Sequence, residues 1–146
     1  MGPKEEKFNQ EKLKIKKEGL AGAMTKYTIN YESIEGFVIM TYDDFKEFDG
    51  LKVYFENKKP NTHKDHDKVA NISAFYPYSL HKTENQTPVK NLGSAVLDNI
   101  IDDIEKDTKL INVSSTSEVL DLMLQKRGFE KYDEHYESRY FYKVLK

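Results

Sequence analysis

The spacing of apolar residues changes once along this chain, and that change constrains the fold more than any other feature. Before residue 77, apolar and polar residues alternate in several short segments, which is typical of strands with one buried face. From Leu97 to Ile104 the apolar residues recur at helical spacing instead, and a short apolar strand pattern follows at residues 110–113. A strand, a helix and a second strand in succession predict that the strands at 69–76 and 110–113 pair in parallel.

The same patterns predict the remaining elements and the fold class. Strands are expected at residues 12–16, 27–31, 37–40, 51–55, 69–76, 110–113, 131–136 and 140–144. Helices are expected at residues 92–106 and from about residue 117 to 127. Ser115 and Glu118 have capping-box spacing, and Gly128 suits the left-handed position after the second helix. We therefore expect an α+β protein: one domain over residues 1–146, a mixed and mostly antiparallel sheet with flanking helices, and disorder at residues 1–10.

The composition excludes several classes of function. The chain has no cysteine, so disulfides, thiolate metal sites and a cysteine nucleophile are excluded. The net charge is -2, which gives no global attraction to nucleic acid or to an anionic membrane. No apolar run approaches the roughly 20 residues needed to span a bilayer. We expect a cytoplasmic protein, monomeric or homodimeric, with no metal and no nucleic-acid or membrane partner.

The turn into the first predicted helix has the composition of an anion site. Lys90, Gly93 and Ala95 give residues 90–95 the form basic-x-x-Gly-x-Ala, between a buried strand and a helix. The first N–H groups of a helix have no partner within the helix and carry the positive end of its dipole. Small side chains at Gly93 and Ala95 let a pyrophosphate approach the backbone, and Lys90 adds a positive charge. The turn on its own also fits an ordinary helix start.

This turn resembles the coenzyme A loop of the GNAT acetyltransferase superfamily, whose pattern is Arg/Gln-x-x-Gly-x-Gly/Ala after a central strand. The strand at 110–113 follows the helix as that family requires. Residues 126–129, Lys-Arg-Gly-Phe, resemble the family's helix-ending motif, and residues 140–145 resemble its last strand. The resemblance covers residues 68–146. It implies a GNAT-like acyl-CoA N-acyltransferase fold and acetyl-CoA as the cosubstrate.

The resemblance also implies the site residues. An amine, on a small molecule or on a protein, would attack the thioester, and a backbone N–H near the end of the 69–76 strand would hold the oxyanion. The strands at 69–76 and 110–113 would part to admit the pantetheine arm. The implied cofactor-binding residues are Phe75, Tyr76, Lys90, Asn91, Leu92, Gly93, Ser94, Ala95 and Ser117. The candidates for the general base are Glu56, Tyr78 and His81.

Two departures from the family pattern leave the function open between two interpretations. The family usually has a Tyr four residues before the helix-ending Gly, where it protonates the leaving thiolate, and here that position is Leu124. Ser117 stands where an Asn commonly contacts the pantetheine arm. Tyr132, Tyr136 or water would have to replace the missing acid in an active N-acetyltransferase. The alternative is a catalytically impaired GNAT-like module that binds a ligand or a partner.

Two polar clusters have both a functional and a structural interpretation. His63 and His66 could bind a metal, but their segment is typical of a solvated loop, and the loop is favoured. The acidic residues from Asp43 to Asp49 could attract a cationic amine, although such clusters more often form a solvated turn.

Overall fold

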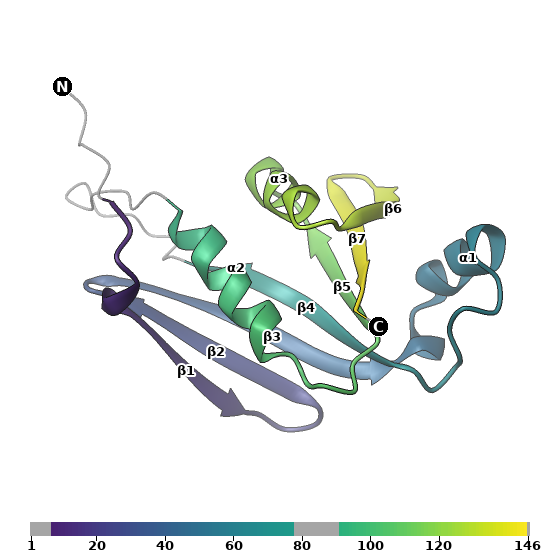
Figure 1. Ribbon diagram of the computed structural model, residues 1–146, viewed down its shortest axis with the longest axis horizontal. Helices are drawn as coiled ribbons and strands as arrows, with labels where there is room; N and C mark the ends of the chain where they lie inside the picture. Colours follow the sequence, from purple (N-terminus) through teal and green to yellow (C-terminus); the bar gives the residue numbers. More distant parts are fainter. Residues whose placement is uncertain (1–6, 78–90, 146) are drawn as a thin grey trace. The chain divides into compact units, whose positions relative to one another are not determined.

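The computed structural model describes residues 7–77 and 91–145 (Figure 1). Seven strands are found in this part of the chain: β1 (Leu13–Gly19), β2 (Met24–Tyr31), β3 (Ile34–Asp44), β4 (Lys68–Tyr76), β5 (Leu110–Ser115), β6 (Glu130–His135) and β7 (Ser138–Val144). The helices are α1 (Asp49–Lys58), α2 (Leu92–Asp103), α3 (Glu118–Lys126) and two short 3-10 helices, η1 (Gln10–Lys12) and η2 (Phe45–Glu47). No helix in this part of the chain is long and apolar enough to cross a membrane.

The strands form a mixed sheet, as the sequence predicts. Their hydrogen-bonding order is β1-β2-β3-β4-β5-β7-β6. β4 and β5 run parallel, which confirms the prediction from the strand–helix–strand pattern, while β1–β2, β5–β7 and β6–β7 are antiparallel. The β4–β5 register runs from Val69 opposite Leu110 to Ile72 opposite Val113, and both strands continue beyond the last pair.

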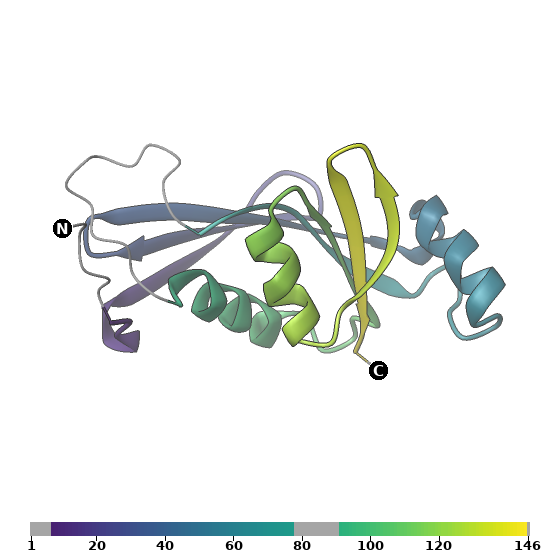
Figure 2. The same ribbon diagram turned by 90° about the horizontal axis from the view of Figure 1, so that it is seen from above.

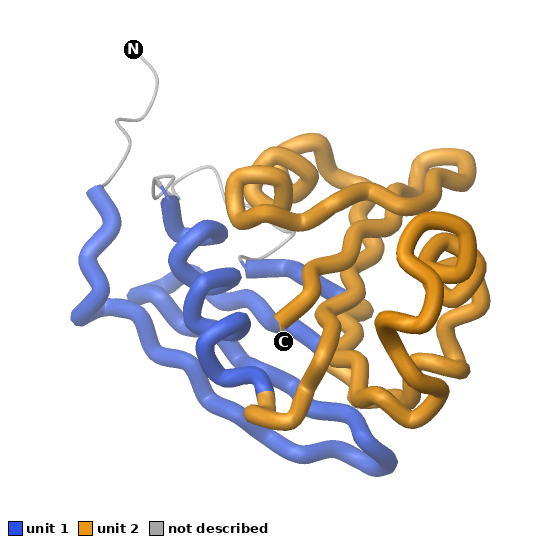
Figure 3. Tube along the Cα trace, turned by 45° about the vertical axis from the view of Figure 1, so that its right-hand side comes forward, with its two compact units in different colours: residues 1–39, 74–104 blue, residues 40–73, 105–146 orange. Residues whose placement is uncertain are grey.

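The chain divides into two compact units (Figure 3). Unit 1 contains residues 1–39 and 74–104, and unit 2 contains residues 40–73 and 105–146. The boundaries fall within β3 and β4, so each of these strands contributes to both units. The expectation of a single domain stays a prediction.

In unit 1, α2 covers one face of the first strands (Figures 1 and 2). Its buried residues are Leu92, Val96, Leu97 and Ile100. At the other end of α2, Asp103 accepts a hydrogen bond from the Tyr27 hydroxyl at 2.8 Å and pairs with Lys17 at 3.0 Å. Burial raises the pKa of Asp103, but the hydrogen bonds from Lys17 and Tyr27 outweigh it, and the net effect lowers this pKa. The C-terminal end of α2 is thereby fixed to β1 and β2.

In unit 2, helix α1 corrects a sequence prediction. Residues 51–55 were expected to form a strand, but they lie in the middle of a helix. Leu51 and Phe55 are buried one helical turn apart, whereas Val53 between them is 55% exposed. Both side chains join a core cluster with Phe45, Val69, Leu110 and Tyr142. The apolar residues 51, 53 and 55 fit a strand by alternation, but residues 51 and 55 also have the i,i+4 spacing of one helix face.

One helix boundary and one helix cap differ from the sequence predictions, while the start of α3 near residue 117 is confirmed. α2 ends at Asp103, three residues before the expected end. The N-cap of α3 is Ser117, whose hydroxyl accepts a hydrogen bond from the backbone N–H of Leu120. Ser115 is therefore not the cap that its spacing from Glu118 suggested. Gly128 has φ +85°, which confirms the left-handed position after α3.

The helical assignment of α1 predicts unequal effects for two matched substitutions. Leu51→Ala should lower the free energy of unfolding by about 2–5 kcal/mol, because it leaves a cavity in the core cluster. Val53→Ala should change it by less than about 0.5 kcal/mol, because Val53 is exposed. Urea denaturation of both variants measures this difference. Similar losses for the two would mean that residues 51 and 53 share one buried face, as they would in a strand.

Candidate functional site

The first part of the candidate site is the start of α2, in unit 1. Asn91 caps this helix with φ +69°, a left-handed conformation that Asn tolerates better than most residues. Its carbonyl oxygen accepts a hydrogen bond from the Ala95 N–H at 3.0 Å. The first turn of α2 contains no acidic residue, whereas that of α3 contains Glu118 and Asp121. The N-terminal end of α2 therefore keeps the positive character that attracts an anion.

The side chains of the first turn of α2 fit that use. Leu92 is buried and anchors the turn in the core of unit 1. Gly93, Ser94 and Ala95 are half-buried, so small side chains line this part of the helix start. None of these three side chains is large enough to keep a phosphate group away from the backbone. Lys90, the predicted cation of this loop, lies outside the described residues.

The second part is the end of β4, which also lies in unit 1. Tyr76 is 40% exposed and its ring lies 5.2 Å from that of Phe37, centroid to centroid. Phe75 beside it is half-buried. Gly36 on β3 approaches this end so closely that an added Cβ would lie 2.4 Å from the carbonyl oxygen of Tyr76. Close backbone packing with β3 therefore holds the end of β4, where the resemblance places the oxyanion donor.

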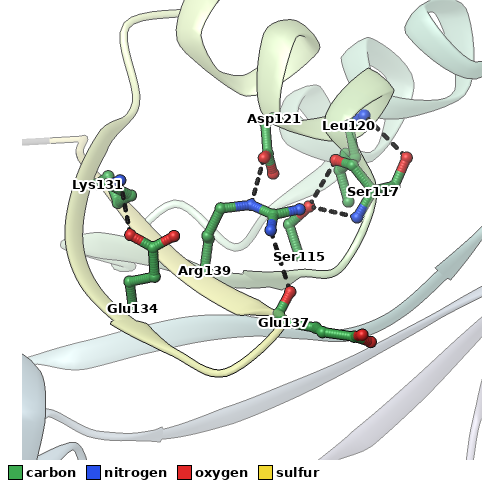
Figure 4. Close-up of polar contacts among 8 residues, drawn as sticks. All are labelled: Ser115, Ser117, Leu120, Asp121, Lys131, Glu134, Glu137 and Arg139. Carbon is green, nitrogen blue, oxygen red and sulfur yellow. Dashed lines mark hydrogen bonds and ion pairs between the residues drawn. The ribbon is translucent and has the colours of Figure 1, made fainter.

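Unit 2 contains the end of β5 and the start of α3 (Figure 4). The hydroxyl of Ser115 donates to the carbonyl oxygen of Ser117 at 3.0 Å and accepts from its N–H at 3.2 Å. The Ser117 hydroxyl then accepts from the Leu120 N–H at 3.3 Å. Ser117 therefore acts as a helix cap, and its hydroxyl still has a proton to donate to a ligand.

A half-buried ion pair joins α3 to β7 beside this cap (Figure 4). The Nε atom of Arg139 donates to a carboxylate oxygen of Asp121, and the guanidinium also donates to the carbonyl oxygen of Glu137 at 3.1 Å. The side chains of Arg139 and Asp121 are only 19% and 14% exposed. This pair holds the first turn of α3 against the C-terminal hairpin.

Leu124, at the position where the resemblance implies an acid, is part of the core. Leu124 is fully buried, and Leu120 one turn earlier is 7% exposed. Of the two tyrosines considered as replacements, Tyr136 is fully exposed at the β6–β7 turn. Tyr132 is half-buried on β6 and donates a hydrogen bond to the side-chain oxygen of Asn112. Burial, and then the negative charge of Asp133, raise the pKa of Tyr132, so this hydroxyl keeps its proton.

The sequence interpretation missed a chain of polar side chains across unit 2. The amide of Asn112 donates to the side-chain oxygen of Asn71 at 2.8 Å, and the amide of Asn71 donates to the hydroxyl of Thr41 at 3.5 Å. Together with Tyr132 these side chains connect β3, β4, β5 and β6. A signal was present, because Asn71 and Asn112 each follow two apolar residues of a buried strand and the parallel register places them opposite each other. Buried amides need such partners.

Of the three candidates for the general base, Glu56 lies within the described residues. Tyr78 and His81 lie outside the described residues. Glu56 is exposed on α1, in unit 2, and lines a cleft of about 250 Å³ with Lys52 and His63. The cofactor residues Phe75, Tyr76 and Asn91 to Ala95 lie in unit 1.

The two loop histidines have separate partners. The side chain of His63 is 6% exposed, lies 3.4 Å from Asp67 and packs against the ring of Phe55 at 4.8 Å between centroids. His66 is 79% exposed and pairs with Asp44 at 3.1 Å. Within residues 7–77 and 91–145, no three metal-ligating side chains gather closely enough to hold an ion.

Comparison with known proteins shows the fold. No protein-family model matches the chain, and no curated protein matches its sequence. A crystal structure of a variant of an agmatine N-acetyltransferase in its apo form is similar, with a TM-score of 0.50 and 13% sequence identity. The match covers 82% of this chain and 76% of that one. The chain therefore has an α+β, GNAT-like acetyltransferase fold, and at this identity the likeness concerns the fold alone.

The cap geometry of α3 predicts how Ser117 can be replaced. Ser117→Ala should lower the free energy of unfolding by about 1 kcal/mol, because the N–H of Leu120 loses its partner. Ser117→Asp should cost much less, because a carboxylate caps a helix equally well and favours its positive end. Thermal denaturation of the two variants checks this ranking. Equal losses would show that the hydroxyl does not cap the helix.

Proposed function

We propose that this protein is an N-acetyltransferase that moves an acetyl group from acetyl-CoA to a primary amine. The observation that carries the proposal is the parallel β4–β5 ladder, which is four pairs long while both strands continue beyond it. Strands that stop pairing leave backbone N–H and C=O groups that a ligand can satisfy. The agmatine N-acetyltransferase with a similar fold supports the same chemistry.

We assign the cofactor to the end of β4 and the start of α2. The N–H groups at Gly93 and Ser94 would hold the pyrophosphate, and the first turn of α2 contains no carboxylate that would repel it. Tyr76 and Phe75 would lie along the acyl arm, and Lys90 would add a charge to the phosphates. Ser117, in unit 2, is the further proposed contact to the pantetheine arm.

The reaction would be a direct transfer. The neutral amine nitrogen forms a bond to the carbonyl carbon of the thioester, the C–S bond breaks, and coenzyme A leaves as a thiolate. The nitrogen loses a proton to a general base, for which Glu56, Tyr78 and His81 remain the candidates. The thiolate takes a proton from Tyr132, Tyr136 or water. Backbone N–H groups near the end of β4 would stabilise the oxyanion of the tetrahedral intermediate.

One observation favours the second candidate function, a GNAT-like module with impaired catalysis. Leu124 is fully buried where the family has its proton donor. Leu cannot donate a proton, and general acid catalysis is typically worth about 10²–10⁴ in rate. Such a module would keep the fold and a ligand but transfer acetyl groups slowly or not at all.

Binding of the cofactor predicts a thermal shift that one substitution removes. Acetyl-CoA should raise the melting temperature of the wild-type protein, because a ligand of the native state stabilises by about 2.7 kcal/mol at a hundredfold excess over its Kd. Gly93→Glu should abolish this rise, because its carboxylate would fill the space for the pyrophosphate and repel it.

Gly19→Glu is the matched control for that experiment. It makes the same substitution at the end of β1, where an added Cβ would meet no atom within 4 Å. The control should keep the full thermal shift. Absence of any shift in the wild-type protein at millimolar acetyl-CoA would argue against cofactor binding altogether.

Turnover distinguishes the enzyme from the impaired module. Release of free thiol from acetyl-CoA should depend on an added amine, in a panel that includes agmatine, polyamines and lysine peptides. The rate should be below about 1 s⁻¹, at the low end of the enzyme range, because α3 supplies no proton donor. A thermal shift without thiol release from any amine would identify the module. Faster turnover would show that another group already supplies the proton.

A further inference from the structure

A small cleft in unit 2 has a lining that suits an organic cation. It has a volume of about 260 Å³ and is formed by the start of α1, by Asn112 of β5 and by the β6–β7 hairpin. Phe48, Tyr132 and Tyr140 supply aromatic rings, and Asp49 and Asp133 supply two carboxylates. The lining contains no Lys or Arg, so its two carboxylates give it a net negative charge.

A β-bulge brings two adjacent side chains of β6 into this cleft. Neighbouring residues of a regular strand point to opposite faces of the sheet. The register between β6 and β7 shifts between Lys131 and Asp133, so Tyr132 is the extra residue. Tyr132 and Asp133 consequently both line the cleft. Bulges often occur next to functional sites, where they redirect a side chain.

The two carboxylates have no cationic partner in the described part of the chain. One oxygen of Asp133 accepts the Glu134 N–H at 2.8 Å, and the other lies 3.7 Å from where a Cβ on Gly50 would be. Asp49 forms no ion pair with any described residue. These carboxylates, Asn112 and His135 do not form a metal-ligand group. A ligand with several positive centres along a thin aliphatic chain matches this lining better than a metal ion does.

The floor of the cleft is fixed before any ligand binds. Asn112 is 5% exposed, and its amide group is oriented by bonds to Asn71 and Tyr132. The rings of Tyr132 and Tyr140 lie 6.2 Å apart at 47°, and aromatic faces attract cations. The pKa of Tyr132 is raised by burial and by the charge of Asp133, so its ring stays neutral and its hydroxyl stays a donor.

We propose that this cleft binds one protonated nitrogen of a diamine or polyamine. The inference rests on the proposed function, because the bound molecule would be the acetyl acceptor. The position of Asn112 on β5 supports a role for this cleft in binding the acceptor. Asn112 lies one pair before the end of the β4–β5 ladder, where the acyl arm would enter. Side chains alternate between the two faces of a strand, so Asn112 lies on the same face of β5 as Leu110, which packs against α1. Ser115 lies on the opposite face of β5.

Calorimetry on the full chain without acetyl-CoA tests the cleft independently of catalysis. Putrescine and spermidine should bind, more weakly at high salt, whereas 1,4-butanediol, which has the same chain length and no charge, should not. Asp133→Asn keeps the size of the side chain and removes its charge, and it should weaken putrescine binding about tenfold or more. Asp102→Asn is the matched control, because Asp102 is exposed on α2 and does not line the cleft.

Gly50→Leu provides a second variant whose fold should be secure. An added Cβ at Gly50 meets its neighbours at ordinary contact distance, and Leu favours a helix more than Gly does, so the variant should fold while its side chain fills the cleft. It should abolish putrescine binding. Unchanged binding in both Asp133→Asn and Gly50→Leu, or no binding of either amine to the wild-type chain at millimolar concentration, would overturn the proposal. The calorimetry contains no acetyl-CoA, so its outcome does not depend on cofactor binding. A failure of the cleft proposal can therefore be distinguished from a failure of the proposed function, which the thermal shift tests.

Discussion

Parallel pairing between β4 and β5 is the constraint on which the rest of the structure depends. Parallel strands need a crossover, and α2 provides it, so the start of α2 must follow the end of β4. The register of the ladder also sets Asn71 opposite Asn112, which brings their amides into hydrogen-bond contact and orients Asn112 toward Tyr132. A shift of one residue would bury both amides without these partners. The pairing therefore determines both the proposed cofactor end of β4 and the floor of the acidic cleft.

The two candidate binding regions differ in the charge they favour. In unit 1, the start of α2 has the positive end of a helix dipole and no acidic side chain in its first turn. In unit 2, the cleft at the start of α1 has two carboxylates and no Lys or Arg. Acetyl-CoA is an anion and a protonated amine is a cation, so the two regions would discriminate between the two substrates of one transfer reaction.

The sequence predicts the fold well where periodicity is unambiguous. The change from alternation to helical spacing identified α2, and with it the parallel pairing of β4 and β5. It failed at residues 51–55, because Leu51, Val53 and Phe55 fit either a strand or one face of a helix. Only the burial of Leu51 and Phe55 against Phe45 and Tyr142 decides between these alternatives, and those are contacts between distant parts of the chain.

The candidate site was less predictable for the same reason. The loop at residues 90–95 is recognisable because its residues are adjacent in sequence. The acidic cleft brings Asp49 together with Tyr132 and Asp133, which come more than 80 residues later in the chain by their numbers. It also depends on the bulge in β6, which no local sequence pattern predicts. The sequence indicates Asp49 only as part of an acidic segment, and Tyr132 only as a strand residue and a possible acid.

The most direct test of the account is to locate acetyl-CoA on the folded chain. In an NMR titration of the ¹⁵N-labelled protein, the backbone amides of Gly93, Ser94 and Ala95 should shift as the ligand saturates, because they lie at the proposed pyrophosphate site. The amides of Ile15 in β1 and Val53 in α1 should not move. Saturable shifts confined to α1 or to the β6–β7 hairpin, with none in the first turn of α2, would contradict the proposed cofactor site.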